Sequence, residues 1–305
     1  MFHQIARNKT KSVIVVFLFF AVWILAGMGI GKLATLNNGT AGGVVAGGVI
    51  AGLLALLAIL WALTMGQFTV LRASGAREVS QAEQPQLYDI VQTLAMGDGL
   101  PMPRVYVIDD PSPNAFATGM SPKSAAITAT TGLLQIMNRE ELEGVIGHEM
   151  SHIRNYDVRL VLIVSTVVAM AALLSSLLWR SLFFTRSNRD NGGAIIILIA
   201  AAAVLSVIAV IVGPIMQFAL SRSRESLADA SGAELTRNPA GLLHALQKLQ
   251  QNDQPFRKMT HATAAMCIDN PLEHHRGWMH RLYDTHPPIE ERIAALQRML
   301  EVRET

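Results

Sequence analysis

Four long windows without a charged residue constrain the fold of this chain more than any other feature. No Asp, Glu, Lys or Arg lies within residues 12–31, 33–71, 160–179 or 191–221. An α-helix needs about 20 apolar residues to cross the hydrocarbon core of a bilayer, and each window can supply them. We therefore expect four transmembrane helices, at Ser12–Ile30, Gly43–Met65, Leu160–Trp179 and Ala194–Leu220.

The composition agrees with a membrane protein. Of the 305 residues, 51% are hydrophobic and 16% are charged, against about 25% charged residues in a typical soluble domain. Glycine and alanine crowd the second window between residues 42 and 52, which suits close packing of helices in a bilayer. The alternative is a large soluble core, which would have to contain four uninterrupted apolar runs of spanning length.

Basic residues beside the windows indicate the orientation of the chain. Arg7, Lys9 and Lys11 precede the first window, and the positive-inside rule places them in the cytoplasm. The apolar stretch that follows is longer than the 7–15 residues of a signal peptide. We interpret it as a retained anchor, and Arg72 after the second window marks the return of the chain to the cytoplasm.

The third and fourth windows leave two arrangements open. Arg186 and Arg189 lie between them, and the positive-inside rule would keep such residues inside. Two full crossings and a shallow membrane hairpin both place the flanking segments on one side. The predicted organisation is an anchor at 1–71, two halves of one cytoplasmic domain at 72–157 and 221–305, and a hydrophobic hairpin at 158–220.

Periodicity predicts the elements of the polar segments. Helices are expected at residues 84–96, 223–234, 242–250 and 289–300, and from 138 through the second histidine at 152, beyond which residues 154–159 can continue the helix into the third window. Strands are expected at Arg104–Ile108, Asn114–Thr118 and Ala125–Thr130. Cys267 is the single cysteine, so no intrachain disulfide can form. The net charge of +2 indicates little about function. The sequence contains no phosphate-binding or nucleic-acid-binding motif.

The sequence His148-Glu149-Met150-Ser151-His152 carries that chemistry. Residues four apart share one face of a helix, so His148 and His152 can present two imidazoles to one zinc ion. Glu149 can take a proton from a zinc-bound water molecule. The alternative is an amphipathic helix with two partly exposed histidines and a solvated glutamate.

A catalytic zinc site needs a third protein ligand. Glu225 is our candidate, and Asp229 lies four residues later on the same helical face. Asp229 could accept the free ring N–H of a ligand histidine and so fix its tautomer. The alternative for this segment is a solvated helix face with Arg222 and Arg224 beside lipid headgroups.

These motifs together resemble the HtpX heat-shock membrane proteases, in the wider group that includes the CaaX prenyl proteases. The resemblance covers almost the whole chain. The matching motifs are Asn114-Ala115-Phe116-Ala117-Thr118-Gly119, Thr131-Gly132-Leu133-Leu134, the segment around the paired histidines, Ser221-Arg222-Ser223-Arg224-Glu225 with Ala228-Asp229, and Thr285-His286-Pro287-Pro288.

The resemblance implies an α-helical membrane protein with a mainly α (α+β) zincin metalloprotease domain that carries a small sheet. It implies one zinc ion per chain, bound by His148, His152 and Glu225. Glu149 would be the general base, and Asp229 would accept a hydrogen bond from a ligand histidine. The active site would face the cytoplasm from a bacterial inner membrane. The partners would be the lipid bilayer and polypeptide substrates, namely misfolded or damaged membrane proteins, and no nucleic acid.

Further roles stay open. The resemblance makes His286 and Arg224 candidates for stabilising the transition state, and Asn114 a candidate for contacting an extended substrate; simpler roles are a turn residue, a lipid anchor and a strand start. The histidines at 274, 275 and 280 lie in a segment outside the matching motifs. Rival functions are a prenyl-protein processing protease and a non-catalytic membrane chaperone or scaffold.

Overall fold

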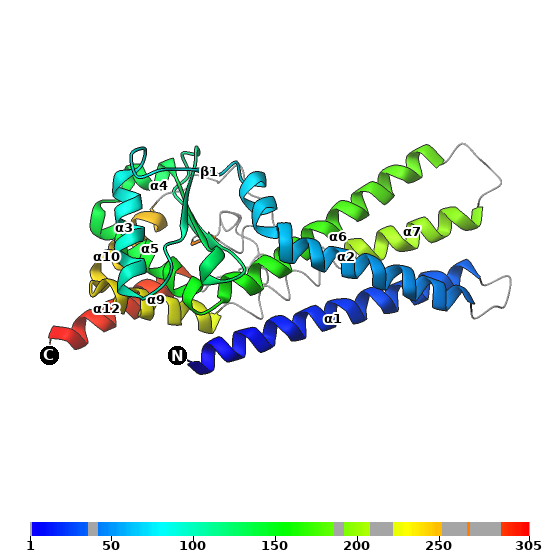
Figure 1. The fold of residues 1–305 in the computed structure, drawn as a ribbon, viewed down its shortest axis with the longest axis horizontal. Helices are drawn as coiled ribbons and strands as arrows, with labels where there is room; N and C mark the ends of the chain where they lie inside the picture. Colours follow the sequence, from blue (N-terminus) through cyan, green and yellow to red (C-terminus); the bar gives the residue numbers. More distant parts are fainter. Residues whose placement is uncertain are drawn as a thin grey trace. The chain divides into compact units, whose positions relative to one another are not determined.

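The computed structural model describes residues 2–35, 42–185, 192–207, 222–251, 267–268 and 288–304 of the chain. Helices dominate these residues, and a small sheet accompanies them (Figure 1). The helices are α1 (Phe2–Ala34), α2 (Gly42–Ala73), α3 (Pro85–Gly97), α4 (Thr131–Ile136), α5 (Arg139–Arg154), α6 (Asp157–Thr185), α7 (Gly192–Val207), α9 (Arg222–Thr236), α10 (Pro239–Gln250) and α12 (Ile289–Glu304). The strands are β1 (Arg77–Glu78), β2 (Arg104–Ile108), β3 (Ala115–Thr118) and β4 (Ala126–Thr130).

The chain divides into two compact units. One consists of Met1–Lys9, Gln67–Leu162 and Gln217–Thr305, and the other of Thr10–Gly66 and Ile163–Met216. The first unit contains the sheet and both polar segments, and we call it the polar unit. The second contains most of the residues in the charge-free windows, and we call it the apolar unit.

Within the apolar unit, α1 and α2 approach each other through glycines. A Cβ atom built on Gly27 would overlap the backbone of Gly47, and one on Gly31 would overlap the backbone of Gly43. The two glycines of each helix are four residues apart and therefore share a face. Small residues at this spacing let helix backbones pack closely in a bilayer.

Two of the described helices are long and apolar enough to cross a membrane, namely Gly42–Ala73 and Asp157–Arg180. Shorter apolar stretches lie at Val16–Lys32 and Ile195–Val207. The structure thus supports spanning helices in the second and third windows. The fourth expected span, Ala194–Leu220, lies partly outside the described residues.

The sheet of the polar unit has the strand order β1-β2-β4-β3. β2 and β4 pair in parallel, with Arg104 opposite Ala126, while β3 runs antiparallel to β4. The three strands expected from alternation form within one residue of their expected bounds. The short edge strand β1 was not expected, because two residues carry no periodic pattern.

α5 is the central helix of the polar unit. A Cβ atom on Gly144 would overlap the backbone of Leu242 in α10, and one on Gly232 of α9 would come within 2.8 Å of the backbone nitrogen of His148. Without side chains at these crossings, α9 and α10 lie directly against α5. The apolar residues of α5, among them Leu142, Val145, Ile146 and Met150, fill the core beside the sheet.

Candidate metal centre

The sequence around α5 explains where the paired histidines lie. Asn138 caps the helix by accepting from the Glu141 N–H, and the Glu141 carboxylate accepts from the Asn138 N–H in return, which satisfies two otherwise unpaired donors. The helix then runs to Arg154 and carries both histidines in its second half. His148 is 1% exposed and Glu149 is 2% exposed, so this face of α5 is not a solvated one.

The ring nitrogens of the two histidines converge with a carboxylate of α9. The Nε2 atoms of His148 and His152 lie 3.1 Å apart, and they lie 3.4 Å from Oε2 and Oε1 of Glu225, respectively. Zinc bonds of about 2.0–2.1 Å in a tetrahedron separate neighbouring ligand atoms by about 3.3 Å. Each of these pairwise distances is close to that edge length, and one ligand atom from each side chain lies within 4.8 Å of the other two, so together they could hold a metal ion.

A second acid holds the other nitrogen of each ring. His148 Nδ1 lies 2.9 Å from Asp229 Oδ1, and His152 Nδ1 lies 3.1 Å from Asp157 Oδ2. An ionised carboxylate only accepts hydrogen bonds, so each ring carries its proton on Nδ1. The two Nε2 lone pairs then face each other and Glu225, an arrangement that a cation stabilises.

The electrostatics around Asp229 favour the ionised carboxylate that accepts the hydrogen bond from His148 Nδ1. Burial alone would raise the pKa of the Asp229 carboxyl, but Arg292 and His148 hold it well below its usual range. Burial also lowers the pKa of His148, yet hydrogen bonds with Asp229 and Glu225 outweigh burial and raise this pKa to about 9. The interior around His148 therefore favours an added positive charge, which a proton or a metal ion can supply.

Glu149 lies beside these ligands, at the edge of the sheet. Burial raises the pKa of the Glu149 carboxyl, while the two histidines and the backbone N–H of Ala117 in β3 oppose this increase. The carboxylate is thus buried close to both the converging ligand atoms and β3. A group held in this way can act as a base toward a water molecule in the site.

Sequence reasoning missed Arg292 and Asp157. Arg292, which is 4% exposed in α12, donates to both oxygens of Asp229 and to the carbonyl of Ile268. One signal for it was available, because Arg292 occupies a core position in the apolar stripe formed by Ile289, Ile293 and Leu296. A charge in such a stripe requires a buried partner.

The remaining candidates occupy different environments. Arg224 is 6% exposed and its Nη1 lies 3.4 Å from Asp157, so it is no lipid-facing anchor. Asn114 is 2% exposed, and its side-chain oxygen accepts from the Ala115 N–H at the start of β3. His286 lies outside the described residues, as do the histidines at 274, 275 and 280.

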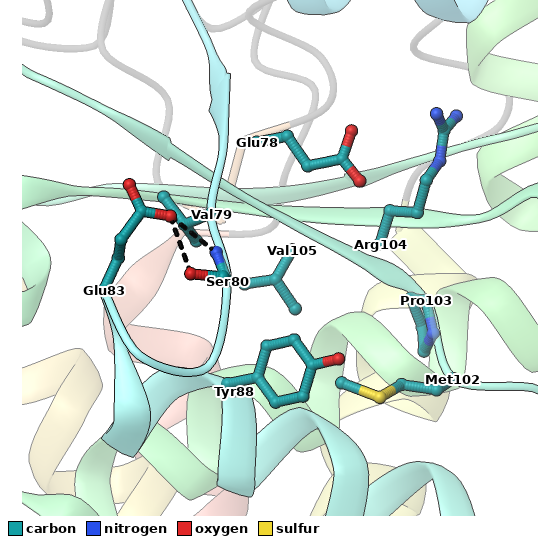
Figure 2. Close-up of a pocket in the computed structure, with 9 residues that line it drawn as sticks. All are labelled: Glu78, Val79, Ser80, Glu83, Tyr88, Met102, Pro103, Arg104 and Val105. Atoms are coloured by element: carbon teal, nitrogen blue, oxygen red, sulfur yellow. Dashed lines mark hydrogen bonds between the residues drawn. The ribbon is translucent and has the colours of Figure 1, made fainter.

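A separate surface pocket of about 580 Å³ lies beside β1 and β2. Figure 2 shows its lining, in which the Glu83 carboxylate turns toward Ser80 and accepts from both its backbone N–H and its hydroxyl. None of the nine lining residues belongs to the metal-binding cluster. We therefore assign the chemistry to the cluster on α5 and α9.

Comparison with known proteins places this arrangement in a family. Residues 81–300 match the model of peptidase family M48. The protease HtpX homologues of Streptococcus gordonii and Lactobacillus helveticus are 44% and 42% identical, each over 98% of this chain and all of the relative. The crystal structure of S. mikatae Ste24p is 22% identical, with a TM-score of 0.48 over 80% of this chain and 57% of that chain.

Such a match over nearly the full length identifies the protein as a membrane metalloprotease. The chain belongs to peptidase family M48. The resemblance noted in the sequence is thereby confirmed.

Proposed function

We propose that this protein is a zinc endopeptidase of the bacterial inner membrane, with His148, His152 and Glu225 as zinc ligands. The observation that supports this most is the spacing of their ligand atoms, at 3.1 and 3.4 Å, close to the edge of a zinc tetrahedron. Two histidines and a carboxylate are also a common ligand set for catalytic zinc. One zinc ion per chain follows, with Asp229 orienting His148.

Zinc held at this site would polarise the carbonyl of the bond to be cut and lower the pKa of a bound water toward about 7. Glu149 accepts the proton of the attacking water and later donates it to the leaving amine. No covalent enzyme intermediate is required.

An extended substrate would pair with β3, which forms one edge of the sheet. The Ile268 N–H already binds the carbonyl of Ala115, at 3.0 Å, so Ala117 beside Glu149 is the better pairing position. Asn114 would support this edge through its bond to the Ala115 N–H. Arg224 and His286 stay candidates for stabilising the developing negative charge.

We further propose that the substrates are misfolded or damaged membrane proteins. The apolar helices α2 and α6 are long enough to anchor the chain in a bilayer, where such substrates are found. The basic residues before the first window and after the second support a cytoplasmic location for residues 72–157 and 221–305. The division into an anchor, two half-domains and a hairpin at 158–220 belongs to this proposal.

The variant Glu149→Gln tests the mechanism. Purified in detergent, it should retain one zinc ion per chain. Its kcat/KM on an unfolded or membrane-protein substrate should fall about 10²–10⁴-fold. Glu143→Gln, on the partly exposed side of α5, is the matched control and should cleave normally. Wild-type rates in Glu149→Gln would refute the assigned base, and retained cellular function without cleavage would favour a chaperone.

A further inference from the structure

The link between α5 and α6 has an unusual backbone. α5 ends at Arg154, Asn155 caps it, and α6 begins at Asp157, so the two helices do not form the continuous helix that the sequence allowed. Tyr156, between the two helices, has φ 61°. A tyrosine in this left-handed region is strained, and such strain persists only where the surrounding structure imposes it.

The left-handed residue changes which side chains can meet. In an unbroken helix, residues five apart point about 140° away from each other, so Asp157 would face away from His152. With the turn at Tyr156, the Asp157 carboxylate instead lies 3.1 Å from His152 Nδ1. The strained residue is therefore what brings this acid onto the histidine.

The contact is buried and braced from a second helix. Asp157 is 3% exposed, and its other oxygen lies 3.4 Å from Nη1 of Arg224, the neighbour of Glu225 in α9. A carboxylate in the first turn of α6 is also stabilised by the helix dipole. Asp157 thus connects His152 on α5, the ligand-bearing helix α9, and the start of α6.

We propose that Asp157 is a positioning residue of the metal centre, placed on His152 by the left-handed turn at Tyr156. This inference rests on the proposed zinc site. By accepting the Nδ1–H, Asp157 directs the Nε2 lone pair of His152 toward the other ligands. Since Asp157 is also the first residue of α6, a helix that continues as a candidate membrane span, the first turn of that helix becomes part of the metal centre.

The first test compares Asp157→Ala with Asp157→Asn in the full-length protein in detergent. Zinc affinity, measured by competition with a chromogenic chelator, should fall about 10–100-fold in Asp157→Ala. Asp157→Asn keeps an acceptor oxygen and should recover part of the loss. The visible spectrum of the Co²⁺-loaded Asp157→Ala protein should also change, because the orientation of His152 determines the ligand field, whereas a purely structural role would leave the spectrum unchanged.

Asp89→Ala, on α3 where Asp89 binds Gln81, is the matched control and should match wild type in both measurements. Wild-type zinc affinity and an unchanged cobalt spectrum in Asp157→Ala would overturn the inference. A wild-type protein that binds no zinc would instead overturn the proposed function, so the two failures are distinguishable.

The second test concerns Tyr156. Tyr156→Gly adopts the left-handed conformation without strain and should retain wild-type zinc affinity. Tyr156→Val, with a β-branched side chain, opposes this conformation and should lower zinc affinity. Arg237 has a similar φ of 54° just after α9, so Arg237→Val carries the same backbone penalty and should leave zinc affinity unchanged. Equal zinc affinities in Tyr156→Val and wild type would contradict the assigned role of the turn.

Discussion

The guanidinium of Arg292 forms two hydrogen bonds with the carboxylate of Asp229, at 3.0 and 2.7 Å, and both side chains are 3% exposed. Asp229 in turn lies 2.9 Å from Nδ1 of His148. A helix near the C-terminus thereby reaches the metal centre through one acid. The pair lies where an unpartnered charge is costly.

Replacing Arg292 by methionine should destabilise the protein strongly. Removing one partner leaves the Asp229 charge buried, which typically costs about 3–5 kcal/mol of unfolding free energy. Denaturant unfolding in detergent micelles measures this loss. Arg298→Met, at an exposed position of the same helix, should change the free energy by less than about 0.5 kcal/mol.

A double-mutant cycle sharpens this first prediction. In the background of Asp229→Asn, the substitution Arg292→Met should cost much less, because no buried carboxylate is then left unpaired. Additive costs for the two substitutions would show that the pair does not act as a unit.

Replacing Glu225 by alanine should remove the proposed third metal ligand. We expect zinc affinity to fall by more than the roughly 10–100-fold loss that is typical when a residue hydrogen-bonded to a ligand is replaced. Free zinc at 100 times its Kd should stabilise the wild type by about 2.7 kcal/mol, and this gain should vanish with a chelator or in Glu225→Ala. Thermal unfolding with and without zinc measures it.

Glu234 lies on the same helix but is exposed. Glu234→Ala is therefore the control for Glu225→Ala, and it should keep the full zinc-dependent stabilisation. Undiminished zinc binding by Glu225→Ala would reject Glu225 as a ligand.

The variant Gly232→Ala should separate α9 from α5. Its new Cβ would lie 2.8 Å from the backbone nitrogen of His148 and 3.0 Å from the His148 Cα, so the backbone has to shift. Overpacking of this kind costs about 1–3 kcal/mol, despite the better helix propensity of alanine. We expect a lower melting temperature and weaker zinc binding, since Glu225 and Asp229 move with α9.

Gly97→Ala is the matched control for the α9 variant. The nearest neighbour of its new Cβ is a flexible leucine atom at 3.7 Å, so stability and zinc affinity should both stay close to wild type. If Gly232→Ala behaves like this control, the close crossing does not set the ligand geometry.

In the apolar unit, Gly47→Leu should disrupt the packing of α1 on α2. A side chain at this position would overlap the backbone of Gly27, and small residues are what permit such close helix packing. Thermal stability in micelles should fall, whereas Gly29→Leu should have little effect because a Cβ at Gly29 meets nothing within 4 Å. Equal stability of the two variants would show that the glycine contact contributes nothing.

Much of the candidate site could be predicted because its signals are local. The helix cap at Asn138 and the four-residue spacing of His148 and His152 depend on near neighbours in the chain, and the structure reproduces both. The strands expected at residues 104–108 and 125–130 likewise form. Arg292 and Asp157 were missed because a charged residue alone does not reveal its distant partner.

The sequence by itself determined the apolar windows and the helix that carries the two histidines, and it indicated the zinc ligands and base that we propose, since each depends on residue type and short spacing. Only the tertiary structure decided how the acids meet the rings. Asp229 reaches His148 because glycines let α9 lie against α5. Asp157 reaches His152 because one left-handed residue reverses the direction of its side chain. Such contacts depend on close packing and backbone strain, which the linear pattern of residues does not encode.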